Sequence, residues 1–265
     1  MKDPIGITEL YEEYIDKKND DNQAERYDGN EYWYHASSVG FCSRKLYFES
    51  IEKVKPTNLP NSTSKRLLRL GTIIHDDIQN ALIYISELIL SDNNISVNEQ
   101  KKKTKYSKKR KVEFDIEGRV ELEYINVRGH YDLVAICKDE SGHVYLYDFK
   151  SIASYGWKLK FGKNPVSNQS KIHELQLATY GLGVKKKYGR LDGMYLTYYC
   201  KDTSVVKSVN VPLTWLGMAE NYWFSINEEH KKGLPGFNMG TSPVYQWCCN
   251  YCQFKNHCNP PLMKK

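Results

Sequence analysis

Two aspartates and a lysine occur in sequence motifs whose side chains could together hydrolyse a phosphodiester bond. Asp148 and Lys150 form an Asp-x-Lys at the end of the apolar run VYLYDFK, and Asp132 closes a Gly-x-x-Asp that starts at Gly129. Side chains alternate between the faces of a strand, so Asp148 and Lys150 are expected to project to the same side. If Asp132 ends a neighbouring strand, the two carboxylates converge and suit Mg²⁺ or Mn²⁺. A lysine beside such a metal can orient an attacking water or help to deprotonate it.

The Asp-x-Lys motif is weak when it stands alone, because it occurs by chance in many proteins as a surface salt-bridge pair. Here it follows an apolar strand and has a Gly-x-x-Asp upstream. The combination is much more specific than either part. It predicts a metal-dependent hydrolytic site.

Upstream of these motifs, the stretch of helical periodicity from Lys65 to Leu90 contains one histidine. A lone histidine is more often a hydrogen-bonded residue at the edge of a core than a metal ligand. His75, however, is followed by Asp76 and Asp77. Successive helical residues diverge by about 100° around the axis, so only one of the three is expected to face the site. We predict that His75 is a metal ligand and that the two aspartates are solvated.

A Gln-x3-Tyr follows the acidic motifs. Gln176 and Tyr180 are four residues apart in a segment with helical patterning, so they are expected to lie one above the other on the same face. Both side chains can hydrogen-bond a phosphate, a base or the attacking water. The alternative is the polar edge of an ordinary amphipathic helix.

Four cysteines bracket these motifs. Cys42 stands alone near the start, and Cys249, Cys252 and Cys258 follow near the end in the spacing Cys-x2-Cys-x5-Cys. Four thiolates can hold either a tetrahedral Zn²⁺ or an iron–sulfur cluster. Such a site would close a very long loop, so metal binding would contribute to folding. Cys248 could replace Cys249, although the Cys-x2-Cys spacing favours Cys249.

The composition predicts a soluble, intracellular protein with a polyanionic partner. The chain has 265 residues with 40% hydrophobic content, enough for a packed core, and no run of about 18 apolar residues. In a reducing compartment its seven cysteines are expected to favour metal binding, with Cys137 and Cys200 as buried apolar residues. The net charge of +6 is concentrated in the run Lys101–Lys111, which suits DNA or forms a solvated loop or hairpin tip.

Apolar periodicity and turn residues predict alternating helices and strands. A short helix over 7–17 and a polar linker up to residue 36 come first. Ser37 and Ser38 are expected to cap a helix that carries Cys42, Arg44 and Tyr47. A long helix, a hairpin, a second helix, two strands and a final helix then follow, at 65–90, 129–151, 170–186, 191–213 and 214–232. Residues 37–265 are expected to form a single domain.

The order of these motifs resembles the RecB-type branch of the PD-(D/E)xK nucleases. The helix-borne histidine, Gly-x-x-Asp, Asp-x-Lys and Gln-x3-Tyr match the successive motifs of that family. One upstream cysteine with a downstream Cys-x2-Cys-x5-Cys is similar to its iron–sulfur members, which include the CRISPR-associated RecB-like exonucleases and the nuclease domain of AddB. The resemblance spans residues 37 to 258. It implies an α/β restriction-endonuclease-like core, a mixed central sheet flanked by helices, with its two ends joined by a four-cysteine cluster.

The resemblance also implies roles for individual residues. The expected ligands of Mg²⁺ or Mn²⁺ are His75, Asp132, Asp148 and the backbone carbonyl of Phe149. The expected catalytic residues are Asp132, Asp148, Lys150, Gln176 and Tyr180. The four cysteines Cys42, Cys249, Cys252 and Cys258 are expected to hold a [4Fe–4S] cluster, with Zn²⁺ as the alternative. Members often have a further glutamate before the Gly-x-x-Asp, and the candidates here are Glu99, Glu113, Glu121 and Glu123.

The function expected from the resemblance is a Mg²⁺- or Mn²⁺-dependent exonuclease that acts on single-stranded DNA ends. The alternatives are a non-catalytic DNA-binding module with a structural metal and a structure-dependent DNA endonuclease. The expected biological process is DNA repair, recombination or CRISPR adaptation. The expected partner is a helicase, a recombinase or a CRISPR-adaptation protein, and no association with a membrane is expected. The expected location is the cytoplasm of a bacterium, or of a host cell if the protein is viral.

Overall fold

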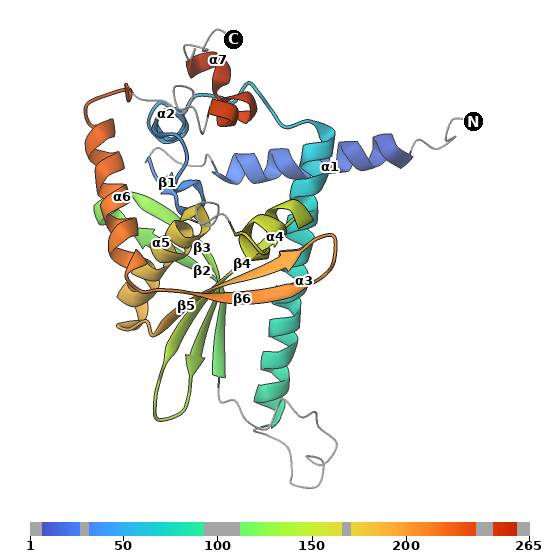
Figure 1. Ribbon diagram of the computed structural model, residues 1–265, viewed down its shortest axis with the longest axis vertical. Helices are drawn as coiled ribbons and strands as arrows, with labels where there is room; N and C mark the ends of the chain where they lie inside the picture. Colours follow the sequence, from blue (N-terminus) through green and yellow to red (C-terminus); the bar gives the residue numbers. More distant parts are fainter. Residues whose placement is uncertain (1–6, 27–31, 93–111, 166–170, 237–245, 259–265) are drawn as a thin grey trace. The chain divides into compact units, whose positions relative to one another are not determined.

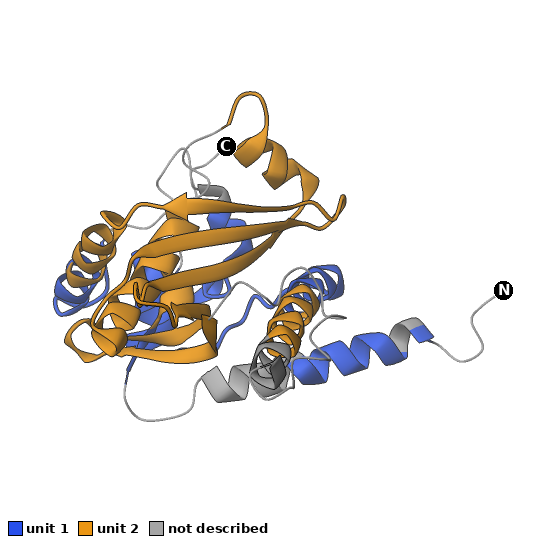
Figure 2. Cartoon of the chain, turned by 90° about the horizontal axis from the view of Figure 1, so that it is seen from below, with its two compact units in different colours: residues 1–34, 41–72, 225–265 blue, residues 35–40, 73–224 orange. Residues whose placement is uncertain are grey.

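The chain divides into two compact units, which are coloured separately in Figure 2. The computed structural model describes residues 7–26, 32–92, 112–165, 171–236 and 246–258. The sheet unit comprises residues 35–40 and 73–224, and the terminal unit comprises residues 1–34, 41–72 and 225–265. The predicted division at residue 36 draws the boundary differently and stays a prediction.

A mixed sheet forms the centre of the sheet unit (Figure 1). Its long strands are β2 (Val112–Leu122), β3 (Val127–Cys137), β4 (Val144–Ile152), β5 (Gly193–Cys200) and β6 (Val206–Val211). β3 pairs antiparallel with both β2 and β4, β4 runs parallel to β5, and β5 is antiparallel to β6. A two-residue strand, β1 (Tyr34–His35), and a short 3-10 helix, η1 (Ala36–Ser38), precede them. The predicted α/β class with a mixed central sheet flanked by helices is confirmed.

The helices accompany this sheet in chain order. They are α3 (Ser62–Asp92), α4 (Ser154–Phe161), α5 (Lys171–Tyr188) and α6 (Trp215–His230). The sequence predicted α3, α5 and α6, together with the β3–β4 hairpin and strands β5 and β6, to within a few residues. It missed α4, a short helix in which no residue is fully buried, so that its helical period is weak. None of the described helices is both long and apolar enough to cross a membrane.

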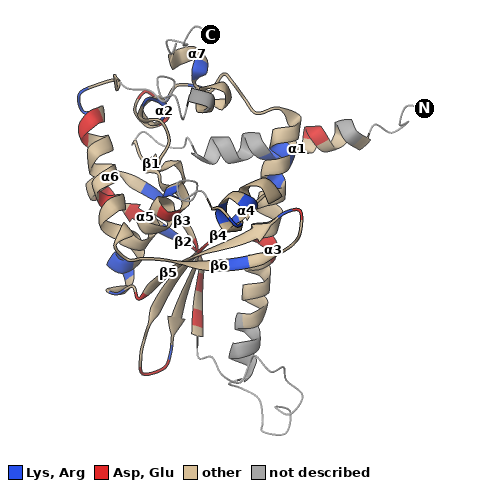
Figure 3. Cartoon of the chain, viewed as in Figure 1, with Lys and Arg blue, Asp and Glu red and all other residues tan. Residues whose placement is uncertain are grey.

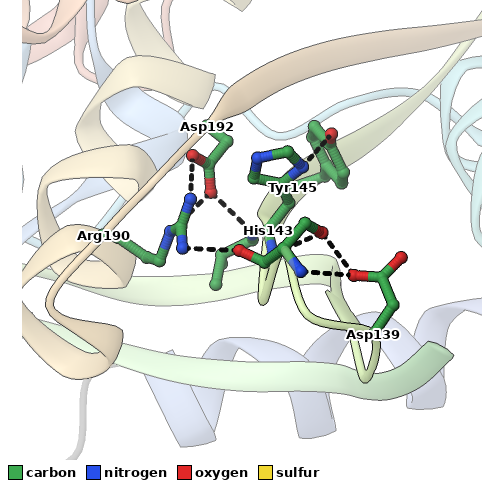
Figure 4. A network of polar contacts seen from close by, with 7 residues as sticks. Asp139, His143, Tyr145, Arg190 and Asp192 are labelled. Atoms are coloured by element: carbon green, nitrogen blue, oxygen red, sulfur yellow. Dashed lines mark hydrogen bonds and ion pairs between the residues drawn. The ribbon is translucent and has the colours of Figure 1, made fainter. Parts of the chain in front are cut away.

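The register of β4 against β5 is held by a polar network at the start of both strands (Figure 4). Arg190 and Asp192 form an ion pair, with Nη2 2.6 Å from Oδ1. The second oxygen of Asp192 accepts the backbone N–H of Val144 at 2.7 Å, and Arg190 Nη1 donates to the carbonyl of Ser141 at 2.8 Å. These bonds tie the β3–β4 turn to the entry of β5. They fix which residues of β5 lie beside the acidic end of β4.

Glycines let α5 approach the sheet closely. A Cβ added at Gly183 would lie 2.3 Å from Cγ1 of Val120 in β2, well inside van der Waals contact. A Cβ at Gly129 in β3 would lie 3.0 Å from the ring of Tyr180 and 3.2 Å from Ala36. Trp223 of α6 donates its indole N–H to Thr179 of α5 at 2.9 Å. The glycine of the Gly-x-x-Asp motif therefore makes room for the tyrosine of the Gln-x3-Tyr motif.

The terminal unit begins with α1 (Ile7–Arg26). This helix runs through the segment predicted to be a polar linker, so that prediction is wrong as far as Arg26. Half of the polar residues in this segment, Lys18, Gln23, Glu25 and Arg26, are good helix formers. Two ion pairs hold α1 to the start of α3, Lys65 to Asp16 at 2.6 Å and Arg66 to Glu12 at 2.5 Å.

A single helix capped by Ser37 and Ser38 is also a wrong prediction. The two serines lie in η1, and Gly40 follows with a positive φ of 75°, which stops a helix there. Cys42 then precedes α2 (Ser43–Leu46), which continues as a π-helical turn, η2 (Tyr47–Ile51). The chain therefore restarts its helix after the glycine.

Replacing Gly183 with alanine tests the close approach of α5. Gly183→Ala is expected to lower the free energy of unfolding by about 1–3 kcal/mol, because its methyl group must displace Val120. Gly217→Ala is the matched control, since nothing lies within 4 Å of a Cβ at that helical position. The control is expected to be neutral or more stable by about 0.5–1 kcal/mol. Urea denaturation of both variants measures the difference, and equal stabilities would contradict the packing described.

Candidate active site

The two acidic strand residues meet in the centre of the sheet unit. The β3–β4 register pairs Leu133 with Tyr147, so one further step places Asp132 opposite Asp148. Both carboxylates are buried, with Asp132 8% and Asp148 1% exposed. Lys150 lies on the same face as Asp148, as the alternation predicts, and its Nζ is 2.5 Å from Oδ2 of Asp148. Asp132, Asp148 and Lys150 are thus brought together.

Few favourable interactions offset the cost of burying the carboxyl group of Asp132. Oδ2 of Asp132 accepts the backbone N–H of Phe149 at 2.5 Å. Burial raises the pKa of Asp132 well above its usual value, and the nearby charge of Asp148 raises it further, while Lys150 and the Phe149 N–H act in the opposite direction. Two carboxylates this close cannot both hold their charge cheaply without a cation. A divalent metal held by Asp132 and Asp148 would supply such a cation.

His75 enters the site from α3. Its Nδ1 lies 3.8 Å from Oδ2 of Asp132, and its ring stands edge-on to that of Phe149 with centroids 6.3 Å apart. Burial lowers the pKa of His75, and the charge of Lys150 lowers it further. A neutral imidazole keeps a lone pair for a metal. Asp76 and Asp77 are exposed.

Sequence reasoning missed one acidic residue of this site, Glu117 of β2. The β2–β3 register pairs Ile116 with Leu133 and Gly118 with Tyr131, which puts Glu117 opposite Asp132. Its charge acts on Asp132 and His75. Gln79 of α3 donates a hydrogen bond to its carboxylate. Glu117 also has a positive φ of 53°, which is costly for a residue with a Cβ and is held by its flanking pairs.

Three of the four glutamates considered from sequence lie elsewhere. Glu113 pairs with Lys138, Glu121 pairs with Arg119, and Glu123 opens the 3-10 turn η4 (Glu123–Ile125) between β2 and β3. Glu99 lies outside the described residues. The signal for Glu117 was the hairpin register: counting back from a turn at 123–126 reaches residue 117 opposite Asp132.

Gln176 and Tyr180 support the site from α5. The side-chain amide of Gln176 donates to the hydroxyl of Tyr180 at 3.0 Å, which confirms that the two stand on one face. Tyr180 is 4% exposed, and burial and the charge of Asp148 raise its pKa. Its hydroxyl therefore stays protonated at neutral pH and can act as a hydrogen-bond donor toward the acidic residues.

The donor set fits a hard divalent cation. Three carboxylates and a neutral imidazole are the ligands that Mg²⁺ and Mn²⁺ accept. Oδ2 of Asp148 accepts no hydrogen bond within the described residues, although the ammonium of Lys150 lies 2.5 Å from it. In the described part of the chain, no group of three or more His, Cys, Asp or Glu side chains is already arranged to hold a metal.

The four cysteines Cys42, Cys249, Cys252 and Cys258 lie in the terminal unit, and all have free thiols. Burial raises the pKa of the Cys249 thiol, and the charges of Cys42, Cys252 and Cys258 raise it further. The thiols are therefore electrostatic neighbours. As with the acidic site, they do not form a finished metal group within the described residues.

The cysteine-rich tail docks on the chain that follows Cys42. It consists of η6 (Gln246–Tyr251) and α7 (Lys255–Cys258). The backbone N–H groups of Thr57 and Asn58 donate to the carbonyl of Gln253 at 3.0 and 3.1 Å. Phe254, fully buried, lies 6.3 Å from Phe48 between ring centroids. Backbone and apolar contacts thus bring the cysteine segments together.

The remaining cysteines differ in burial. Cys200 is buried in β5, whereas Cys137 at the end of β3 is only half-buried, contrary to the expectation for it. Cys248 is half-buried beside Cys249. The basic run Lys101–Lys111 lies outside the described residues.

Comparison with known families agrees with this geometry. The family model described as the PD-(D/E)XK nuclease superfamily matches residues 93–259, more than half of the chain. The chain belongs to this superfamily. Membership implies a metal-dependent nuclease, and the matched range contains Asp132, Asp148 and Lys150.

Other comparisons add less to this superfamily assignment. A solved structure, that of SSO0001, is similar with 17% sequence identity over 98% of each chain and a TM-score of 0.46. No curated protein matches the chain significantly.

Neutralising Glu117 tests its place in the acidic site of this nuclease. Glu117→Gln is expected to weaken Mn²⁺ binding by about 10-fold or more, because one negative charge near the metal is lost. Glu121→Gln is the matched control, since Glu121 lies on the same strand, is exposed and pairs with Arg119. Mn²⁺ titration by calorimetry, with a thermal melt of each variant, gives the comparison. Equal affinities for the two variants would place Glu117 outside the metal site.

Proposed function

We propose that this chain is a RecB-type DNA exonuclease that hydrolyses phosphodiester bonds at single-stranded DNA ends with Mg²⁺ or Mn²⁺. The observation that carries the proposal is the proximity of His75, Glu117 and Asp148 to Asp132, with Lys150 beside Asp148. These residues come from four elements that are separate in sequence. A binding module without activity has no use for buried carboxylates beside a lysine, because they repel DNA.

The chain's own residues would divide the reaction among them. His75, Glu117, Asp132 and Asp148 would hold the metal, which lowers the pKa of a water and offsets charge that develops on the phosphate. Lys150, held by Asp148, would orient that water and stabilise the negative charge that develops on its oxygen as the proton leaves to solvent. Tyr180, fixed by Gln176, would donate a hydrogen bond to a phosphate oxygen.

The preference for single-stranded ends rests on the resemblance to the RecB-type members. Tyr180 and Gln176 could bind a phosphate of either a single strand or a duplex, so these residues do not choose between them. A structure-dependent endonuclease is the nearest alternative, and it would use the same metal site. A non-catalytic DNA-binding module is the alternative of a different class.

A [4Fe–4S] cluster held by Cys42, Cys249, Cys252 and Cys258 is the second part of the proposal. The mutual influence of their thiols and the docking of the tail on residues 48–58 support it. All four lie in the terminal unit, so the cluster would act on the stability of that unit and would take no part in hydrolysis. Zn²⁺ is the alternative occupant.

Removing the lysine tests the enzymatic claim. Lys150→Ala is expected to reduce Mn²⁺-dependent degradation of an end-labelled single strand by about 100-fold or more, because the attacking water loses its orienting group. Lys186→Ala, an exposed lysine in the last turn of α5, is the charge-matched control and should keep full activity.

Assays with different forms of DNA distinguish the alternative functions. Cleavage of covalently closed circles would favour the endonuclease, and binding without cleavage would favour the binding module. Undiminished nuclease activity in Lys150→Ala would contradict the proposed active site.

Anaerobic purification tests the cluster. The proposal expects a coloured protein with bound iron, and Cys252→Ala is expected to lose the iron and to lower the melting temperature. Cys200→Ala, a buried cysteine of the sheet unit, is the control and should keep its iron. A colourless protein with stoichiometric zinc would reject the iron–sulfur assignment and keep the metal site.

A further inference from the structure

A row of side chains leads away from Lys150 across the sheet. The β4–β5 register pairs Lys150 with Tyr198, and the β5–β6 register pairs Tyr198 with Lys207. Side chains of paired residues lie on the same face. Adjacent strands are about 4.8 Å apart, so this row extends about 10 Å from the catalytic lysine.

Rings and ammonium groups of α4 complete this row. We call Trp157, Lys160, Phe161, Tyr198 and Lys207 the α4 cluster. Lys160 Nζ lies 4.6 Å from the ring centroid of Tyr198, and Lys207 Nζ lies 4.6 Å from that of Phe161. Trp157 packs against Phe161 with centroids 4.6 Å apart. Two cations are thus held over ring faces beside the active site.

A histidine of α5 connects the α4 cluster to Lys150. Nδ1 of His173 lies 3.1 Å from the hydroxyl of Tyr198. Burial lowers the pKa of His173 to about 3, and the charges of Lys150 and Lys160 contribute. His173 therefore lies within electrostatic reach of both lysines. It also stands three residues before Gln176, on the same side of α5.

The charge of the α4 cluster is positive and concentrated. α4 carries both Lys158 and Lys160, and Figure 3 shows this helix as a basic segment. Burial lowers the pKa of Lys160, whereas the negative charge of Glu174 acts to raise it. Lys207 is exposed. Helix α4 begins just after β4 ends, at the carboxyl ends of the parallel pair β4 and β5, where α/β proteins commonly bind ligands.

Packing alone would account for the rings of the α4 cluster but not for its cations. If these lysines served only to cover aromatic rings, placing several of them close together would be unfavourable, because like charges repel. A phosphodiester strand offsets that repulsion. The half-buried rings of Trp157 and Phe161 offer apolar surface to a base, and only an unpaired base has a free face.

We propose that the α4 cluster binds the unpaired DNA strand next to the scissile phosphate. Lys160 and Lys207 bind phosphates of this strand, and Trp157 with Phe161 supports a neighbouring base. The proposal rests on the proposed nuclease function, because the cluster starts at Lys150. It gives the single-strand preference a site of its own, formed by residues that take no part in the chemistry.

Salt dependence measures the phosphate contacts. Binding of fluorescein-labelled oligo(dT) is followed by anisotropy without divalent metal, so that no strand is cut, over a range of NaCl concentrations. Lys160→Ala and Lys207→Ala are each expected to reduce the slope of log K against log[salt] by about 0.7, the loss of one phosphate contact on a single strand. Lys186→Ala is the control that removes one charge elsewhere and should leave the slope unchanged.

Replacing the ring of Trp157 tests its proposed contact with a DNA base. Trp157→Leu keeps apolar volume against Phe161 but removes the stacking surface, and is expected to weaken oligo(dT) binding by about 5-fold or more. Binding to a blunt duplex of the same length should not change. Tyr84→Leu, an exposed ring on α3 that is 61% accessible, is the matched control. Thermal melts of all variants identify any that fail to fold.

The outcomes separate the two proposals. If the native protein degrades DNA but Lys160→Ala and Lys207→Ala keep the native salt slope, the α4 cluster is not the strand site and the nuclease function stands. Equal weakening of single-strand and duplex binding by Trp157→Leu would also overturn the claim of an unpaired strand. If the native protein neither binds nor degrades DNA, both proposals fall.

Discussion

The pairing of β3 with β4 is the constraint on which the site depends. It places Asp132 opposite Asp148 in a buried part of the sheet, where burial and the charge of Asp148 raise the pKa of Asp132. The fold offsets this with the ammonium of Lys150 and the N–H of Phe149, both from β4. The polar network at the start of β4 and β5 keeps that strand in register. A slip of one residue would turn Asp148 and Lys150 to the opposite face.

Close packing of α5 follows from the same constraint. Tyr180 can stand beside the acidic residues only because Gly129 leaves space for its ring, and α5 can lie that near because Gly183 meets Val120 without a side chain. The helix then carries His173, Gln176 and Tyr180 along one side. Strand register and helix approach together determine the geometry of the site, and each depends on residues that take no part in the chemistry.

Much of this site could be predicted from the sequence, because its residues belong to strong local patterns. Asp148 and Lys150 follow the period of a strand, and Gln176 and Tyr180 follow that of a helix. Glu117 could not be found this way, since it is identified only by the residue opposite it. Helix α4 was missed because none of its residues is fully buried, and α1 was cut short because polar composition was taken for a linker. The two units mix segments that are far apart in sequence, which local periodicity cannot reveal.

The distribution of charge explains why metal and basic residues are needed together. Glu117, Asp132 and Asp148 form an acidic row across β2, β3 and β4, and this row repels a phosphate. Lys150 lies one step along β4, where the row of Tyr198 and Lys207 begins. Under the proposed function, a DNA strand would be held by the basic row, and its scissile phosphate would reach the acidic row only when a divalent cation lies between them. Binding of the strand and activation of the water would then fall to adjacent rows of one sheet, and the metal would link them.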